Sequence, residues 1–219
     1  MYKVCMVSLG CPKNQVDAEM MLKLLENDGF EICGEEAQAD AIIINTCGFI
    51  ESAKAEAIEN ILEASQYKKD GNCKALVVTG CLAERYRDDV TEEIPEVDVC
   101  VGIGSNDKIA EIVKNAIEGK KGNFYGEKNE LNLNNDRILG GYPFSTYLKI
   151  GDGCDNCCTY CAIPKIRGRM RSRTIEDCVN EAKKLADKGV TELIVVAQDT
   201  TAYGTDIYGE PKLAELLSA

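Results

Sequence analysis

Three closely spaced cysteines in the second half of the chain are the residues best suited to chemistry. Cys154, Cys158 and Cys161 stand in the run Gly-Cys-Asp-Asn-Cys-Cys-Thr-Tyr-Cys. Three thiolates can hold three irons of a cubane 4Fe–4S cluster, whereas complete cysteine ligation takes four, so the fourth iron is left open to another ligand. A closed zinc site is the alternative, but it also needs four ligands. The chain has no His, and Cys157 adjoins Cys158 and cannot easily reach the same metal.

A second set of cysteines is spread over the first half of the chain. Cys11, Cys47 and Cys81 each follow a short apolar run that predicts a strand. The carboxyl ends of parallel strands share one edge of a sheet, where ligands bind, so the three thiols are expected to converge. Three buried free thiols are the alternative, since Cys packs well as a small hydrophobe. The equivalent positions favour a second cluster. The other cysteines lack this relationship and are interpreted as packing residues or as bystanders without a role: Cys5, Cys33, Cys73, Cys100, Cys157 and Cys178.

Hydrophobic patterning predicts the strands and helices that position Cys11, Cys47 and Cys81. Short apolar runs alternate with amphipathic stretches, which predicts an α/β fold with an open parallel sheet of the flavodoxin-like type. The predicted strands are Val4–Leu9, Ala41–Asn45, Ala75–Thr79 and Val97–Val101. The predicted helices cover residues 14–28, 51–67 and 84–93, and a fourth begins at Ile109 and ends near Gly119.

The second half begins a different unit. Residues 120–142 are rich in Gly, Asn and charge, which predicts a linker between a domain at 1–119 and another at 143–219. A strand at Thr146–Ile150, a helix capped by Thr174 and ending at Lys188, and a strand at Leu193–Ala197 predict the first part of a β/α barrel. Two strands cannot close a barrel, so we expect a truncated chain.

The composition of the chain limits which binding partners and which cellular compartment we expect. The net charge of −12 argues against direct nucleic-acid binding. The basic run Lys165, Arg167, Arg169, Arg171 and Arg173 opposes that trend. It is either a solvated loop or a site beside the cysteines for the carboxylate of a ligand or an acidic part of the substrate. Without a secretory signal, the 12 Cys indicate metal or redox chemistry in a reducing cytoplasm. No stretch is long enough to span a membrane.

The triad, with Tyr160 before its last Cys, resembles the signature of the radical S-adenosylmethionine (SAM) superfamily. Preceded by three separated Cys on an α/β domain, it resembles the methylthiotransferases over essentially the whole chain. Two segments, Ser8–Asn14 (Ser-Leu-Gly-Cys-Pro-Lys-Asn) and Ala197–Gly204 (Ala-Gln-Asp-Thr-Thr-Ala-Tyr-Gly), are similar to the branch that modifies an aspartate of a small-subunit ribosomal protein. The resemblance also implies a small C-terminal β-domain that engages the substrate, which we expect the truncated chain to lack.

The resemblance implies two 4Fe–4S clusters and SAM as cofactors. The triad would be catalytic and hold the SAM-cleaving cluster, and Cys11, Cys47 and Cys81 would hold an auxiliary cluster that carries the sulfur to be inserted. The product would be a methylthio group on the β-carbon of aspartate.

The resemblance also implies two cofactor-binding side chains and two kinds of partner. Tyr160 would lie near the adenine of SAM and Gln198 near its methionine part; a core aromatic and a strand-end polar group are the alternatives. The partners would be the ribosomal protein and an electron donor such as flavodoxin or ferredoxin. A tRNA methylthiotransferase and a non-catalytic iron–sulfur module are the rival functions.

Overall fold

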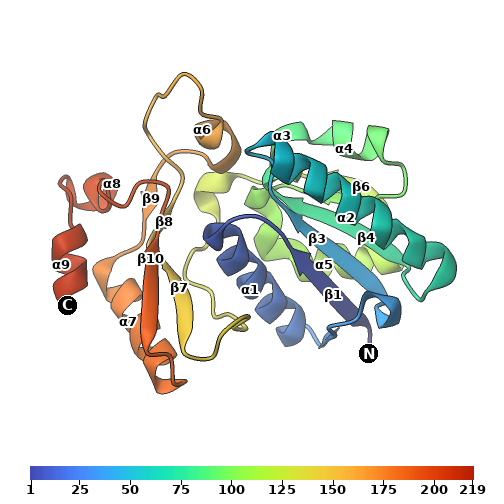
Figure 1. Cartoon of the computed structure of the whole chain (residues 1–219), viewed down its shortest axis with the longest axis horizontal. Helices are drawn as coiled ribbons and strands as arrows, with labels where there is room; N and C mark the ends of the chain where they lie inside the picture. Colours follow the sequence, from blue (N-terminus) through green and yellow to red (C-terminus); the bar gives the residue numbers. More distant parts are fainter. The chain divides into compact units, whose positions relative to one another are not determined.

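A computed structural model describes all 219 residues, which form two compact units, Met1–Leu131 and Asn132–Ala219. The boundary falls within the segment for which the sequence predicts a linker. No helix is long and apolar enough to cross a membrane. The elements in chain order (Figure 1) are β1 Lys3–Ser8, α1 Pro12–Asn27, β2 Glu31–Ile32, η1 Glu36–Gln38, β3 Ala41–Thr46, α2 Glu51–Asp70, β4 Ala75–Gly80, α3 Cys81–Tyr86, α4 Asp88–Glu93, β5 Val99–Val101, η2 Ile103–Lys108, α5 Ile109–Ile117, β6 Gly122–Phe124, η3 Lys128–Glu130, β7 Ser145–Lys149, β8 Gly151–Asp152, α6 Ile163–Arg167, β9 Arg171–Ser172, α7 Ile175–Asp187, β10 Glu192–Val196, α8 Thr205–Tyr208 and α9 Leu213–Ser218.

The N-terminal unit is built on a six-stranded parallel sheet with the strand order β2-β1-β3-β4-β5-β6. The central strands β3 and β4 are buried along their whole length, which explains their continuous apolar sequences. This order extends the flavodoxin-like 2-1-3-4-5 pattern by one strand. The predicted fold class is confirmed.

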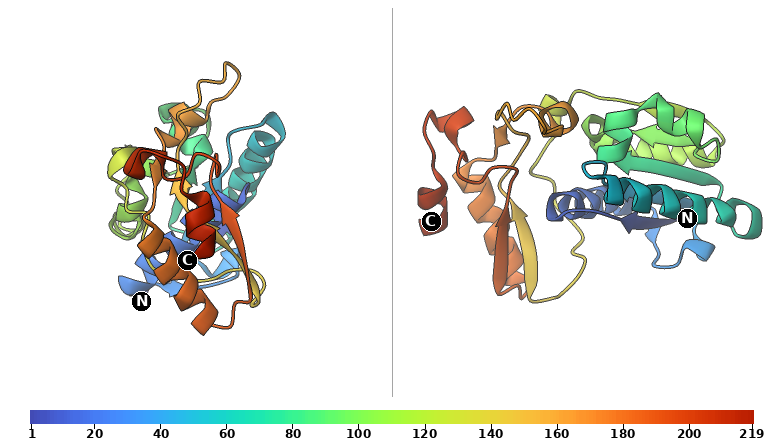
Figure 2. Two further views of the ribbon diagram at one scale, coloured as in Figure 1. Left: turned by 90° about the vertical axis from the view of Figure 1, so that its left-hand side faces the viewer. Right: turned by 45° about the horizontal axis from the view of Figure 1, so that its top comes forward.

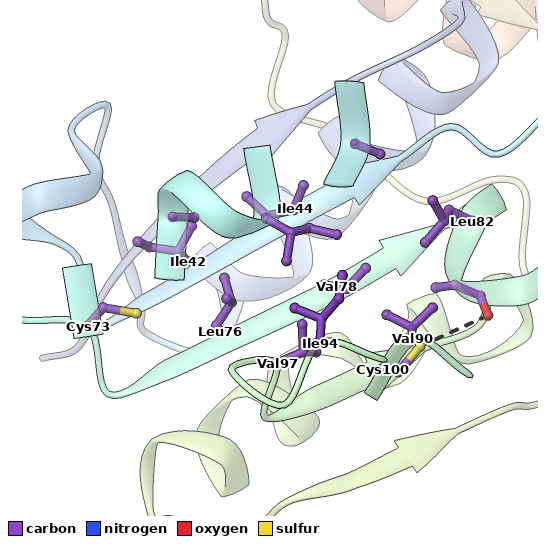
Figure 3. Close-up of a cluster of buried hydrophobic side chains, with 14 of the residues drawn as sticks. Ile42, Ile44, Cys73, Leu76, Val78, Leu82, Val90, Ile94, Val97 and Cys100 are labelled. Atoms are coloured by element: carbon purple, nitrogen blue, oxygen red, sulfur yellow. Dashed lines mark hydrogen bonds between the residues drawn. The ribbon is translucent and has the colours of Figure 1, made fainter. Parts of the chain in front are cut away.

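Helices cover both faces of the sheet, and alternate residues of each strand point to opposite faces. On one face, Ile42 and Ile44 of β3 and Leu76 of β4 belong to a buried cluster with side chains of α2, α3 and α4 (Figure 3). On the other face, Ile43 and Val77 belong to a second cluster with side chains of α1 and α5. The two layers of helices hold the strands in place, so the strand ends form a fixed edge.

Two edge strands and one helix break of this unit escaped prediction. Strand β2 has two residues and β6 has three, and both lie at sheet edges, where no long apolar run is needed. The predicted helix at 84–93 is two helices, α3 and α4, because Arg87 between them has a φ of +48°. A residue with positive φ cannot continue an α-helix.

The C-terminal unit contains a parallel β–α–β arrangement. Strands β7 and β10 pair side by side (Figure 2), and α7 contributes Cys178 and Val179 to the apolar cluster that includes residues of both strands. Helix α7 begins where the sequence predicts, because the side-chain oxygen of Thr174 accepts a hydrogen bond of 3.1 Å from the Asp177 amide. The start of a β/α barrel is confirmed. The two-residue strands β8 and β9, which pair antiparallel beside it, were not predicted.

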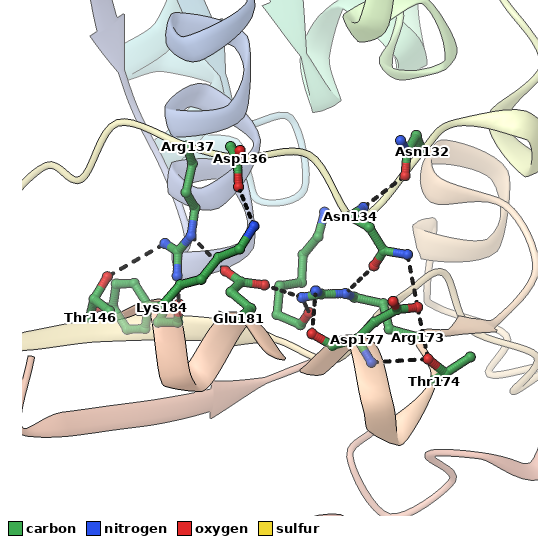
Figure 4. Close-up of polar contacts among 12 residues, drawn as sticks. Asn132, Asn134, Asp136, Arg137, Thr146, Arg173, Thr174, Asp177, Glu181 and Lys184 are labelled. Carbon is green, nitrogen blue, oxygen red and sulfur yellow. Dashed lines mark hydrogen bonds and ion pairs between the residues drawn. The ribbon is translucent and has the colours of Figure 1, made fainter. Parts of the chain in front are cut away.

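A polar segment ties the start of this unit to α7 (Figure 4). The side-chain amide of Asn134 donates to Asp177 at 3.0 Å, and its oxygen accepts from Arg173 at 2.7 Å. Glu181 of α7 forms ion pairs with both Arg137 and Arg173, whose side chains are buried. Residues 132–137 are therefore fixed to α7 by charged and amide groups, in place of the apolar packing that sequence patterning detects.

Candidate cysteine-ligated metal sites

The ends of β1, β3 and β4 bring the first set of cysteines to one edge. In the sheet register, Ser8 pairs with Asn45 and Asn45 pairs with Thr79. Cys11 follows three residues after the first of these positions, and Cys47 and Cys81 follow two residues after the others. The three cysteines therefore leave adjacent strands at the same level of the sheet.

Two glycines allow the cysteine-bearing loops to touch. A Cβ added at Gly10, which has a φ of +92°, would lie 2.5 Å from the Cβ and 3.2 Å from the sulfur of Cys47. A Cβ added at Gly48 would lie 2.7 Å from the Cα of Leu82 and 3.2 Å from the carbonyl carbon of Cys81. Real Cβ atoms do not tolerate contacts below 3.0 Å. The loop of Cys11 thus packs on Cys47, and the loop of Cys47 packs on the backbone of Cys81.

A buried amide pair fixes the shape of these loops. The Asn14 amide donates to the carbonyls of Leu9 at 2.7 Å and Thr46 at 3.2 Å. The Asn45 amide donates to the carbonyl of Asn14 at 2.8 Å. The side-chain oxygen of Asn45 is buried and has no hydrogen-bond partner. Because buried amides are specific about their partners, this network fixes the backbone on both sides of the first two cysteines.

The three thiols form no disulfide and differ in exposure. Cys11 and Cys47 are partly exposed, and Cys81 is buried. Cys11 is the N-cap residue of α1, and Cys81 is the first residue of α3.

The donor set can be tested against the group that the sequence predicts. No three Cys, Asp or Glu side chains of the chain stand in position to hold a single metal ion. A cubane cluster makes a different demand, because each thiolate binds a separate iron and the sulfurs need not surround one point. Three thiols without a disulfide, on loops that leave adjacent strands and pack against one another, suit a cluster better than a zinc ion.

The second set of cysteines lies on the loop between β8 and α6. Cys154 and Cys161 are partly exposed, and Cys158 is exposed. The amide of Cys161 donates to the carbonyl of Cys158 at 3.0 Å, which closes a tight turn over the last part of the triad. All three thiols are free, so the structure leaves them available on one short loop.

The base of this loop is closed by backbone packing. Gly153 has a φ of +75°, and a Cβ there would lie 2.0 Å from the carbonyl oxygen of Arg169. The amide of Cys154 donates to the carbonyl of Gly168 at 3.2 Å. The residues before the first cysteine and after α6 therefore touch, so that residues 154–167 form a loop with fixed ends.

The buried carboxylate of Asp152 forms ion pairs at the base of the same loop. Asp152 pairs with Arg167 at 3.0 Å and with Lys149 at 3.2 Å, and all three side chains are buried. Burial raises the pKa of Asp152, but the positive charges of Arg167, Lys149 and Arg171 outweigh it and hold the pKa well below its usual range. Asp152 is therefore ionised, and it joins β8 to the end of α6.

The two predicted cofactor-binding side chains lie in different surroundings. Tyr160 is 86% exposed, so its alternative interpretation as a core aromatic is wrong. The Gln198 side-chain nitrogen donates to Asp152 at 2.9 Å, and its oxygen is buried without a hydrogen-bond partner. Cys157, which the sequence argument sets aside as a ligand, is exposed beside the triad.

The basic run divides between buried and exposed positions. Arg167 and Arg173 are buried in ion pairs with Asp152 and Glu181, so the interpretation as a solvated loop is wrong for them. Arg169 is exposed and lies 3.3 Å from Asp155. Much of this charge therefore serves internal pairing and does not form an open anion-binding surface.

The cysteines interpreted as packing residues include four that are buried. Burial raises the pKa of Cys5 to about 12 and that of Cys100 to about 11, and it raises the pKa of Cys73 and Cys178 as well. Thiols with such pKa values remain protonated near neutral pH and are poor ligands and nucleophiles.

Sequence reasoning missed the groups that hold the cysteines in place. Gly10, Gly48 and Gly153 each adjoin a candidate ligand, and each lies against another segment of backbone or against a cysteine. The signal was present, because Gly precedes Cys11, Cys81 and Cys154 and follows Cys47. Glycine beside a functional residue indicates close backbone approach. The roles of Asn14 and Asp152 left no comparable signal.

Comparison with protein families matches both halves of the chain. Residues 3–102 match the family described as Uncharacterized protein family UPF0004, and residues 148–217 match the Radical SAM superfamily. Each match contains one complete set of candidate cysteines. The resemblance stated from the sequence is confirmed.

Curated relatives align with nearly the whole chain. Proteins named ribosomal protein uS12 methylthiotransferase RimO are 52% identical over 219 residues in Desulforamulus reducens and 51% identical over 219 residues in Clostridioides difficile. A protein of that name in Acetivibrio thermocellus is 50% identical over 231 aligned positions. The alignments cover 98–99% of this chain and 49% of each relative, so the chain spans about half the length of the relatives it matches.

Solved structures support the fold. The radical S-adenosylmethionine methyltransferase TsrM from Kitasatospora setae, with tryptophan substrate and a SAM analogue bound, aligns with a TM-score of 0.69 at 12% identity, over 100% of this chain and 50% of that one. A second structure of TsrM, with cobalamin and a [4Fe-4S] cluster bound, aligns with a TM-score of 0.66 at 14% identity, over 99% of this chain and 52% of that one. At these identities the likeness concerns the fold alone.

Proposed function

We propose that the chain belongs to the radical SAM methylthiotransferases and forms part of an enzyme that adds a methylthio group to the β-carbon of an aspartate in ribosomal protein uS12. The observation that carries this proposal is the presence of two separate sets of three cysteines without a disulfide, one set on each unit of the chain. The names of relatives about 50% identical to the chain support the choice of substrate.

We propose Cys11, Cys47 and Cys81 as the ligands of an auxiliary 4Fe–4S cluster. Their shared sheet edge and the contacts of Gly10 and Gly48 support this assignment. Three thiolates leave one iron without a protein ligand, where a sulfur atom could be carried. The role of the sheet is to keep the three loops in contact.

We propose Cys154, Cys158 and Cys161 as the catalytic ligands of the second 4Fe–4S cluster, with SAM as the further cofactor. When bound, this cluster and SAM supply the reducing electron and the radical chemistry that activates a carbon–hydrogen bond. The closed loop base at Gly153 and Asp152 holds the triad. Tyr160 is proposed to cover the adenine of SAM, since it is exposed on this loop, and Gln198 is proposed to contact the methionine part.

The proposal extends to compartment and partners. Twelve cysteines without a disulfide, and a ribosomal protein as substrate, support a reducing cytoplasm. An electron donor such as flavodoxin or ferredoxin is required to reduce the cluster that acts on SAM. The net charge of −12 and the internal pairing of Arg167 and Arg173 speak against direct nucleic-acid binding and favour a basic protein substrate.

The experiment that tests the substrate uses the full-length enzyme, because this chain spans half of its relatives. Purified uS12 and unmodified tRNA are each incubated with the reconstituted enzyme, SAM and reductant, and the products are examined by mass spectrometry. We expect a methylthio group on an aspartate of uS12, none on tRNA, and none on either with a Cys154→Ala variant. Modified tRNA beside unmodified uS12 would overturn the proposal and establish the tRNA-modifying alternative. The absence of 5′-deoxyadenosine with every substrate would favour a non-catalytic iron–sulfur protein.

A further inference from the structure

Asp152 lies among hydrogen-bond donors. Its carboxylate accepts a hydrogen bond of 2.9 Å from the amide of Gly153 and one of 3.0 Å from the Arg167 guanidinium, and the Lys149 ammonium lies 3.2 Å away. The side chain is completely buried. Every neighbour named here donates, so both carboxylate oxygens of Asp152 act as acceptors.

This carboxylate fixes the orientation of a side-chain amide on another strand end. The Gln198 nitrogen Nε2 lies 2.9 Å from Oδ1 of Asp152. An amide can present either its nitrogen or its oxygen to a neighbour, and the choice follows from the hydrogen-bond network. Two oxygens facing each other without a proton would repel, so the nitrogen of Gln198 must face Asp152.

The other end of the amide is left without a donor. Oε1 of Gln198 is buried and has no hydrogen-bond partner. Burying an acceptor without a donor is unfavourable, so such atoms in native proteins call for an explanation, and a ligand is a common one. Asp152 lies two residues before Cys154, which places this acceptor at the base of the triad loop.

We infer that Asp152 is a positioning residue, which holds Gln198 by its nitrogen and so presents Oε1 as a fixed acceptor for an N–H or O–H donor of SAM. The inference rests on the proposed function for the identity of the ligand. It adds the reason why a glutamine, whose amide has both a donor and an acceptor, suits this position. One end is held by the protein and the other end is offered to the ligand.

A purely structural role makes a different prediction. If Gln198 only joined the end of β10 to β8, its oxygen would be irrelevant and its removal would change stability without changing SAM affinity. The pair Asn156 and Asp199 provides a matched control, because the Asn156 amide donates to Asp199 at the same 2.9 Å, between the triad loop and the residues after β10, but in an exposed position.

The test measures the dissociation constant of radiolabelled SAM by equilibrium dialysis. The 219-residue chain is reconstituted without oxygen, and iron is counted in each sample. Gln198→Leu, which has no polar atoms, should weaken SAM binding about tenfold, which corresponds to about 1.4 kcal/mol. Asn156→Ala should change it less than twofold. Asp152→Asn should weaken it by a similar or smaller factor than Gln198→Leu, because an Asn can donate as well as accept and no longer fixes the amide.

The double variant decides whether Asp152 acts through Gln198. We expect Asp152→Asn to cause no further loss of SAM affinity when Gln198 is already Leu, because there is then no amide to orient. Losses that multiply in the double variant, or Gln198→Leu binding SAM as tightly as wild type at equal iron content, would overturn the inference. If Asp152→Asn fails to retain iron, the single variant Gln198→Leu decides alone. A wild-type chain with its full iron content that binds no SAM would overturn the proposed function itself, and this inference with it.

Discussion

A side chain at Gly10 should separate the loops of Cys11 and Cys47. In Gly10→Ala the new Cβ would lie 2.5 Å from the Cβ of Cys47, and the φ of +92° would strain any L-residue. The backbone strain costs about 1–2 kcal/mol. The forced contact adds about 1–3 kcal/mol, the usual range for overpacking.

A matched variant separates the two effects. Gly29 has a φ of +88° and nothing within 4 Å of an added Cβ, so Gly29→Ala carries the strain without the contact. The difference in the free energy of unfolding between the two variants, measured in denaturant on the metal-free chain, should be about 1–3 kcal/mol. Because the contact displaces Cys47, Gly10→Ala should also lose about four irons after reconstitution, and Gly29→Ala none. Equal stabilities and equal iron contents for the two variants would refute the reasoning.

Three further predictions concern the loop base, the sheet and the polar segment. Gly153→Ala should abolish SAM-dependent 5′-deoxyadenosine formation while Gly189→Ala, with a φ of +93° and no neighbour, retains it; equal activities would contradict the clash. Burial raises the pKa of Asp98, but hydrogen bonds from Lys68, the Leu76 amide and Lys121 outweigh it and leave the pKa lowered. The ionised Asp98 should therefore stabilise the folded chain fully above about pH 4. This contribution should vanish as the pH falls through the lower pKa of the folded state. Denaturant unfolding should then show Asp98→Asn to be more destabilising at pH 7 than at pH 2. Glu181→Ala removes the shared partner of buried Arg137 and Arg173 and should cost about 3 kcal/mol in thermal unfolding, whereas exposed Lys184→Ala should cost below about 1 kcal/mol; a similar cost for both would refute it.

The central strands of the sheet could be predicted because burial of both faces requires a continuous run of apolar residues. Ile42, Ile43 and Ile44 are completely buried, and only a strand covered by helices on both sides accepts such a run. Edge strands leave no such mark, because β6 is largely exposed and β2 has two residues. The break between α3 and α4 depends on the positive φ of Arg87, which the residue type does not predict.

The candidate sites could be predicted only as far as topology decides them. Strand ends in a parallel sheet meet at one edge, and this was enough to group Cys11, Cys47 and Cys81. The contact between Gly10 and Cys47 and the hydrogen bond between Gln198 and Asp152 join residues 37 and 46 positions apart, and they depend on how loops approach in three dimensions. The assignment of the six cysteines as cluster ligands stays a prediction.

The measurement that tests this account most directly is the iron and sulfide content of the chain after anaerobic reconstitution. Three proteins are compared: wild type, a triple variant with Ala at Cys11, Cys47 and Cys81, and a triple variant with Ala at Cys154, Cys158 and Cys161. We predict about eight irons with matching sulfide in wild type and about four in each variant, since each set of thiols holds its own cluster. About four irons in wild type, unaffected by loss of the first set, would contradict the auxiliary site. Zinc without sulfide would contradict the account as a whole.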